Sequence, residues 1–284
     1  MDKRLEEVFD TNPELKAPVL TVYTEWWTND VFELLSWVFI RYSTVDFLNT
    51  RNEFSKMKIL HRYIPKFTPE PLILWENEHW IAYRWAPWEM WNCSTSCDQF
   101  HDHDRLSSDL AEYISAFHSI PVEEFESVTM PRKNRSHERF HRVNKNDQWY
   151  QWKEFYHTWR WFVAHVGNNR KCFPLHKSYI VPCHNDLHSG NCIIDTKTWG
   201  LSWVVDFTEV WFWDMHTDFA LLYLDSQSVC ERTIEKYTTD TWVCLDIDRV
   251  RHYASIYALQ YCFVEKSKRY QQARALITSI MKQW

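Results

Sequence analysis

Glycine is scarce in this sequence: 3 of its 284 residues are Gly, where about 7% is ordinary. Tryptophan is frequent, with 18 residues. It stands where turns usually prefer glycine, as at Trp26, Trp88, Trp203 and Trp213. A bulky ring at a position that needs positive φ would strain the backbone. The composition suggests an engineered or computationally altered sequence, whose motifs can survive while its activity does not.

Other features are missing altogether. The chain has no uncharged apolar run of roughly eighteen residues, which argues against a membrane span. Its first residues, Met1 to Glu7, are charged and lack the apolar core of a signal peptide. A net charge of −6 argues against nucleic acid as the main partner. The 8 cysteines are mostly isolated among apolar residues, which is typical of free thiols in a reducing cytoplasm. We therefore expect a cytoplasmic protein.

The most informative segment runs from His184 to Asn191, His-Asn-Asp-Leu-His-Ser-Gly-Asn. Its His-x-Asp-x-x-x-x-Asn spacing is that of a kinase catalytic loop. Phosphoryl transfer from a nucleotide requires a group that positions the attacking hydroxyl, together with oxygen ligands that hold Mg²⁺. Asp186 fits the first role. Asn191 fits the second, together with Asp206 at the end of a later apolar run.

The residues between these groups predict a hairpin. Residues 193–195 and 201–205 have strand composition, and 196–200 has that of a turn. Such a hairpin would bring Asn191 and Asp206 together at one end, as a shared cation requires. The alternative is a surface hairpin whose Asp and Asn cap its turns.

The remaining sequence predicts strands first and helices later. A helix is expected at 4–12, then an antiparallel meander, a helix at 46–61 and two further strands. The strand-like runs are 19–23, 31–35, 37–42, 72–75 and 80–83. Helical spacing dominates from Asp104 onward, including 147–165 and most of 214–284. We predict a bilobal α+β fold, with an antiparallel β lobe (1–86), a larger helical lobe (87–284), a link near 84–87 and a cleft between the lobes.

At this point the sequence resembles the aminoglycoside phosphotransferase family, small-molecule kinases with a protein-kinase-like fold. Members read His-Gly-Asp-Leu-His-Pro-Gly-Asn where this chain has His184 to Asn191. Their Gly-Asp-Pro-x-x-Asp-Leu-Ala segment is similar to 213–220, their Leu-His-Ser/Ala-Ile/Val-Pro helix end to 117–121, and their Trp-Val-Phe-Arg strand to 37–41. The resemblance covers most of the chain.

The resemblance implies a role for each matching residue. Asp186 would orient the substrate hydroxyl, with Asn191 and Asp206 on magnesium. Arg41 would contact the phosphates of ATP or GTP and pair with Glu53. Five further residues are implied in the loop, its support and the purine site. They are His184 in the catalytic loop, for which we favour a structural role over that of a base, Asp218 as a brace behind the loop, and Tyr83, Arg84 and Ala86 beside the purine.

The chain departs from the family at several positions. Asn185 replaces a usual Gly and Ser189 a usual Pro, and Arg41 stands where many members have Lys. The tryptophans at 88, 203 and 213 fall on family Gly positions, as does Trp26 near the loop that covers the phosphates. We expect these rings to impair enzymatic turnover more than they impair the fold.

Some residues also allow simpler interpretations. Arg41 and Glu53 could form a solvated surface pair worth about 0–1 kcal/mol. Cys93, Cys97, His101 and His103 group the residue types that bind zinc, but their spacing matches no familiar zinc site. His188 is expected to belong to the loop architecture, and the aromatic residues of 149–161 to the core.

Acidic residues dominate from 206 to 248 and predict an anionic wall beside the acceptor, which would suit a cationic, polyhydroxylated antibiotic. A macrolide is the alternative, although the related macrolide kinases carry His at the position of Asn191. A kinase of a choline- or sugar-like alcohol and a catalytically inactive kinase-shaped redesign are the other hypotheses. We expect a monomer that binds a nucleoside triphosphate and a small substrate, and neither nucleic acid nor membrane.

Overall fold

The structure is a computed structural model of the whole chain. It describes residues 3–26, 29–34, 37–43, 47–75, 79–84, 89–90, 103–126, 128, 177–195 and 197–262. Among these, no helix is long and apolar enough to cross a membrane.

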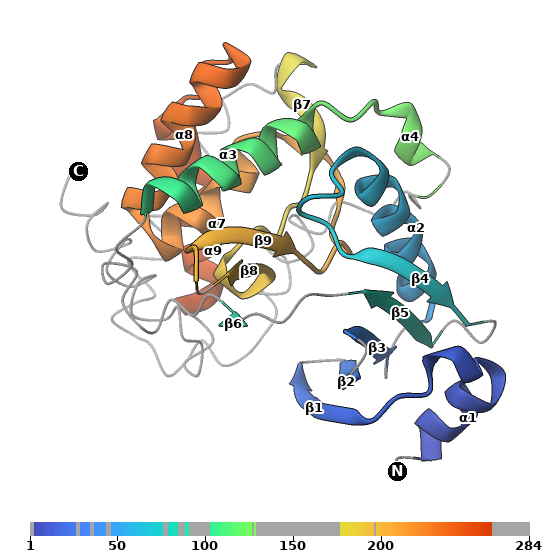
Figure 1. Ribbon diagram of the computed structural model, residues 1–284. Coiled ribbons are helices and arrows are strands. Elements are labelled where there is room, and N and C mark those ends of the chain that lie inside the picture. The colour runs from blue at the N-terminus through green and yellow to red at the C-terminus, as the bar shows by residue number, and fades with distance from the viewer. Residues whose placement is uncertain are drawn as a thin grey trace, which may run out of the picture.

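The first part of the chain forms a five-stranded antiparallel sheet in the order β1-β2-β3-β5-β4 (Figure 1). Consecutive strands β1, β2 and β3 are neighbours, which confirms the predicted meander. Strand β5 then pairs with β3, and β4 lies outside it. The bounds are β1 (Val19–Trp26), β2 (Asn29–Leu34), β3 (Val38–Ser43), β4 (Glu70–Leu74) and β5 (Trp80–Arg84).

The two faces of this sheet belong to different cores because side chains alternate along a strand. Ile40 of β3 lies in a cluster with Leu5 and Phe9 of helix α1 (Lys3–Thr11). Phe39, its neighbour, belongs to a larger cluster that includes Leu60 of α2 (Phe47–Tyr63). Arg41 is on the same face as Phe39, so the sheet directs this cation toward α2. A short 3₁₀ turn, η1 (Pro13–Leu15), follows α1.

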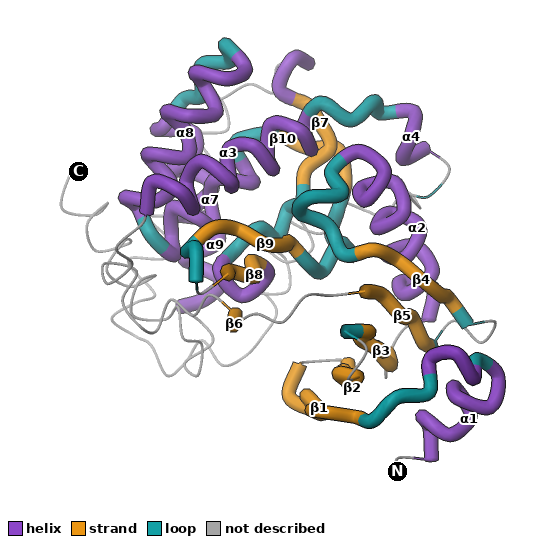
Figure 2. Tube along the Cα trace, in the orientation of Figure 1, coloured by secondary structure: helices purple, strands orange, loops and turns teal. Residues whose placement is uncertain are grey.

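The second part is mainly helical and carries two small sheets (Figure 2). One sheet has the order β6-β8-β9, and the other pairs β7 with β10. Helix α3 packs along α8, and α7 packs against α8 and α9. The strands are β6 (Glu89–Met90), β7 (Ile180–Cys183), β8 (Cys192–Asp195), β9 (Gly200–Val204) and β10 (Trp211–Asp214). The helices are α3 (His103–His118), α4 (Glu123–Glu126), η4 (Lys177–Tyr179), η5 (Ser189–Asn191), α7 (Thr217–Asp225), α8 (Gln227–Thr241) and α9 (Ile247–Cys262).

This architecture confirms the predicted α+β fold, with an antiparallel sheet first and helices after it. Strand β10 was not predicted, because its four residues Trp-Phe-Trp-Asp show no alternation. The helix expected at 147–165, the residues 85–88 of the link and the chain beyond Cys262 lie outside the described residues. The lobe boundary between 86 and 87 therefore stays a prediction.

Backbone strain falls on other tryptophans than expected. Trp203 and Trp213 lie in strands β9 and β10 without positive φ, so the expectation of strain there is wrong. Positive φ occurs instead at Trp37, Trp199 and Trp242. The turn geometry decides which residue becomes left-handed, and the family pattern of glycines did not indicate these positions.

Trp242 follows helix α8 in the left-handed conformation, with φ 59° and its side chain 90% exposed. A left-handed L-residue costs roughly 1–2 kcal/mol, and glycine avoids this cost. We expect Trp242→Gly to raise the free energy of unfolding by about 1 kcal/mol, measured by urea denaturation. Trp242→Ala, which keeps the Cβ, should not give this gain. Equal stability of the Gly variant and the wild type would contradict the assigned strain.

Candidate active site

Strands β8 and β9 form the predicted hairpin, with Cys192 opposite Val204. Beyond that pair, the Val205 N–H donates to the Asn191 carbonyl at 3.0 Å. The backbones of Asn191 and Asp206 therefore meet at one end of the hairpin. The geometric prediction from the sequence is confirmed, while the metal-binding roles of the two residues stay predictions.

Asn191 also contacts Asp186. Its Nδ2 donates to the Asp186 carbonyl at 2.9 Å and lies 3.5 Å from the Asp186 carboxylate Oδ2. With the amide nitrogen directed at Asp186, the amide oxygen is the atom that can ligate a cation. The loop thus brings a carboxylate and a neutral oxygen ligand together.

His188 contacts Asp186 from within the same loop. Its Nδ1 accepts the Gly190 N–H at 2.9 Å, so the proton of the neutral ring is on Nε2. Nε2 lies 3.7 Å from Asp186 Oδ2. A Cβ at position 190 would lie 2.8 Å from the His188 ring, which explains the glycine there. His188 is part of the loop architecture, as expected, and it faces the carboxylate.

Asp206 adopts a left-handed conformation, with φ 62°. Its Oδ1 accepts the Thr208 hydroxyl and, at 3.4 Å, the Thr208 N–H. Aspartate tolerates this backbone region better than most residues. The local turn fixes how the carboxylate is presented at the end of the hairpin.

Arg41 and Glu53 form the predicted ion pair, but it is buried and not solvated. The guanidinium meets the carboxylate through two contacts, at 3.0 and 2.5 Å. Burial opposes the charge of Arg41, yet the attraction of Glu53 outweighs it and, with weaker help from Tyr83 and Asp206, raises the pKa of the guanidinium. Arg41 is therefore a permanent cation in the electrostatic field of Asp206.

The three residues proposed for the purine have different positions. Tyr83 is buried, and its ring stacks on Phe39 with centroids 6.1 Å apart. Burial raises the pKa of Tyr83, so its hydroxyl stays protonated. Arg84 is exposed and pairs with Glu70 on the neighbouring strand. Ala86 lies outside the described residues.

Asp218, in the first turn of α7, supports the catalytic loop. Its Oδ2 accepts the His184 N–H at 2.9 Å, and its Oδ1 accepts the Asn185 N–H at 2.8 Å. The carboxylate is fully buried. This contact corresponds to the brace implied by the family resemblance.

Asp225 supports the same loop from the other end of α7, and sequence reasoning missed it. Its Oδ2 accepts the Ser189 N–H at 2.7 Å. Asp218 and Asp225 are seven residues apart, or about two helical turns, so they share one face. That spacing, across a buried apolar run, was the available signal.

His184 and Asn185 secure the start of the loop. The His184 ring is fully buried, and its Nε2 donates to the Val205 carbonyl at 3.1 Å. Asn185 has φ 61°, which suits the glycine usual in the family. The Asn185 Nδ2 lies 3.1–3.2 Å from the carbonyls of Cys183, Glu209 and Trp211, and these contacts offset the cost of the left-handed backbone.

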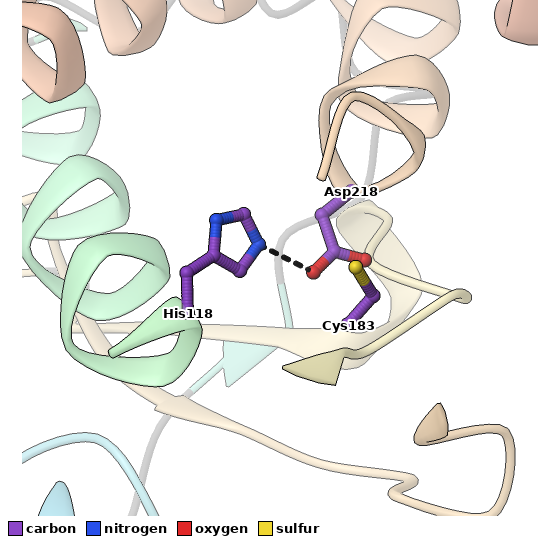
Figure 3. Close-up of side chains that lie close together, drawn as sticks. All are labelled: His118, Cys183 and Asp218. Carbon is purple, nitrogen blue, oxygen red and sulfur yellow. Dashed lines mark hydrogen bonds and ion pairs between the residues drawn. The ribbon is translucent and has the colours of Figure 1, made fainter. Parts of the chain in front are cut away.

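His118, Cys183 and Asp218 lie close enough to hold a metal ion, as Figure 3 shows. Their hydrogen bonds are complete without one: His118 joins Asp218 at 3.2 Å and the Tyr237 hydroxyl at 3.0 Å. Burial, reinforced by Asp218, raises the pKa of the Cys183 thiol and opposes thiolate ligation. This cluster is part of the brace. The other zinc candidates, Cys93, Cys97 and His101, lie outside the described residues, as does the side chain of His103.

Asp214 is a second buried support that the sequence did not reveal. It accepts hydrogen bonds from His216 Nδ1 at 2.6 Å, Arg249 Nε at 2.6 Å and the Tyr253 hydroxyl at 3.0 Å. His216 Nε2 in turn accepts the Asp246 N–H at 3.1 Å. The network ties β10 to the start of α9.

The pKa of Asp214 predicts acid sensitivity. Burial opposes its ionisation, but His216 and Arg249 outweigh burial and lower the pKa below 3.8. A carboxyl with a depressed folded-state pKa stabilises the fold above its unfolded pKa, and that stability is lost as pH falls. We expect the free energy of unfolding to fall from about pH 5 downward in urea titrations. Asp214→Asn should reduce this slope, and an unchanged slope would contradict the assignment.

The anionic wall stays a prediction. Asp214 and Asp225 are buried and accept hydrogen bonds from the protein, so these two acids do not face a substrate, whereas Asp218 lies behind the loop as the resemblance implied. Asp246 accepts the N–H groups of Asp248 and Arg249 at the start of α9. Buried and capping acids cannot be distinguished from substrate-facing ones by composition.

Comparison with known proteins identifies the family and the fold. The model of the phosphotransferase enzyme family, APH, matches residues 20–251. Among curated proteins, none matches. The fold is similar to aminoglycoside 2'-phosphotransferase-IIIa in its GDP complex, at 14% identity, TM-score 0.74, and coverage of 98% of this chain and 97% of that one.

Two other solved structures have the same fold. Spectinomycin phosphotransferase APH(9)-Ia, bound to AMP, has 14% identity, a TM-score of 0.67, and coverage of 98% of this chain and 94% of that one. Macrolide 2'-phosphotransferase type I has 14% identity, a TM-score of 0.64, and coverage of 98% and 97%. At this identity the likeness shows the fold, and the family model shows the membership. The chain belongs to the phosphotransferase enzyme family.

Proposed function

We propose that this enzyme transfers the γ-phosphoryl group of ATP or GTP to a hydroxyl of an aminoglycoside-like substrate. The observation that carries the proposal is the loop in which Asn191 contacts Asp186 and adjoins Asp206. Phosphoryl transfer requires a positioning carboxylate and oxygen ligands for a cation, and the contacts of this loop support assigning these roles to Asp186, Asn191 and Asp206.

Asp186 accepts a hydrogen bond from the substrate hydroxyl and orients it for in-line attack. The amide oxygen of Asn191 and the carboxylate of Asp206 are hard ligands that suit Mg²⁺. When bound, this ion neutralises charge on the donor phosphates. His184 contributes as a buried support for the loop and does not touch the substrate.

Arg41 is the group best suited to the donor phosphates. Its Nε is buried and has no hydrogen-bond partner among the described residues, while Glu53 holds the other end of the guanidinium. A buried donor without an acceptor is costly, and an anionic oxygen would satisfy it. The backbone near Tyr83, Arg84 and Ala86 would receive the purine. The GDP and ATP complexes of similar structures agree with either nucleotide.

The substrate class is inferred from the names of similar structures and from the residue at position 191. Several similar structures are named for aminoglycosides, including a gentamicin complex. Asn191 stands where related macrolide kinases carry His. A macrolide substrate is the second candidate, because the macrolide 2'-phosphotransferase has the same fold and because Asp214 and Asp225 of the expected acidic wall are buried. We further propose a monomer in the cytoplasm, with lobes 1–86 and 87–284.

Thermal unfolding with Mg²⁺ and nucleotide tests the donor site. A nucleotide at 100 times its Kd should stabilise the protein by about 2.7 kcal/mol. The acceptor is then tested with a panel of aminoglycosides, macrolides and choline. Release of nucleoside diphosphate is the measured signal. Stabilisation without release for any alcohol would favour an inactive scaffold, and absence of both would refute the proposal.

A further inference from the structure

Helix α2 carries a second buried charge close to Glu53. Lys56 is 6% exposed and lies three residues further on, so both side chains emerge from one face of the helix. The Lys56 Nζ donates to the Thr208 carbonyl at 2.9 Å, across 152 residues of sequence. Burying an amino group is costly unless it is hydrogen-bonded, so this contact defines the place of the side chain.

Thr208 in turn holds Asp206. Its hydroxyl and its N–H donate to the Asp206 Oδ1. A continuous series of contacts therefore runs from α2 through Lys56 and Thr208 to the carboxylate. The same helix holds Arg41 through Glu53.

We propose that Lys56 is a positioning residue for the metal site. It fastens the turn that carries Asp206 to α2, so that the metal ligand and the phosphate-contacting Arg41 keep one relative geometry. This inference rests on the proposed function, because it takes Asp206 as a ligand of Mg²⁺. Outer contacts of this kind orient the ligands of a metal, and their loss typically weakens metal binding.

A purely electrostatic role for Lys56 makes the opposite prediction. Its charge opposes the rise in the pKa of Glu53, which burial causes. If charge balance were its only role, removing this cation from the turn that carries Asp206 would leave metal binding unchanged or make it tighter. If Lys56 fastens the turn, removing it makes binding weaker.

The test is a titration of the full chain with Mn²⁺ in the presence of nucleotide. Electron paramagnetic resonance measures how much Mn²⁺ is bound. Lys56→Met should weaken Mn²⁺ binding about tenfold or more, and Lys56→Arg, which keeps a donor, should recover most of the loss. Lys58→Met is the matched control, because it removes an exposed lysine from the same helix and should change binding less than about twofold. Circular dichroism confirms that each variant is folded.

Two outcomes overturn the proposal in distinguishable ways. If Lys56→Met binds Mn²⁺ as tightly as wild type, or more tightly, while Asp206→Asn loses binding, the metal site is correct and Lys56 does not position it. If Asp206→Asn binds like wild type, the assigned ligand is wrong, and the proposed function and the role of Lys56 fail together.

Discussion

Replacing Asp186 with asparagine is expected to lower kcat for phosphoryl transfer by about 10²–10⁴-fold, the usual range for a positioned acid–base group. The amide keeps the shape of the side chain but cannot take the proton of the hydroxyl. The main contact of Asn191 is to the Asp186 backbone carbonyl, so the loop should persist. Steady-state release of nucleoside diphosphate measures kcat, and nucleotide-dependent thermal stabilisation should remain.

Asp195 offers the control for this substitution. It lies at the other end of β8 and accepts the Lys197 N–H in the hairpin turn. Asp195→Asn should keep kcat within about twofold, because the turn is remote from the loop. Full activity of Asp186→Asn would exclude Asp186 as the positioning group.

Replacing Asp218 with alanine should be the most destabilising of these changes. The substitution removes the acceptor of two backbone N–H groups, at His184 and Asn185, and of His118. Unsatisfied buried donors cost about 1–3 kcal/mol each, so we expect a loss of about 3–4 kcal/mol in the free energy of unfolding. Urea denaturation, monitored by tryptophan fluorescence, measures this free energy of unfolding.

The exposed Asp240 of α8 provides the comparison. Asp240→Ala should stay within about 0.5 kcal/mol of wild type. His118→Ala should fall between the two, because it removes one partner of Asp218 and leaves both backbone donors satisfied. A loss below about 1 kcal/mol in Asp218→Ala would show that water or another group replaces the brace.

Local patterns were sufficient to predict the hairpin of 193–205 and the meander of β1 to β3. Their side-chain alternation and turns are contained within a few residues. The Arg41–Glu53 pair and the support by Asp218 were inferred through the family resemblance, and both contacts are present. A local sequence pattern does not specify whether such an ion pair is buried or exposed to solvent.

The missed contacts join residues that are distant in sequence. Ser189 and Asp225 are 36 residues apart, Asp214 and Arg249 are 35 apart, and Lys56 and Thr208 are 152 apart. Each depends on how helices pack, which composition does not specify. The acidic residues of 206–248 demonstrate the problem, since the same residue type caps a helix, supports a loop or faces solvent according to its tertiary position.

Helix α7 holds the catalytic loop at both of the helix ends, through Asp218 and Asp225. These contacts limit how far the lengths of the helix and the loop can change. Because the two turns between Asp218 and Asp225 span the distance from Asn185 to Ser189, the helix serves as a template for loop length. An insertion or deletion in either segment would put one carboxylate out of register with its amide. Amide protons of the loop should consequently exchange with deuterium together with those of α7, as one cooperative opening unit.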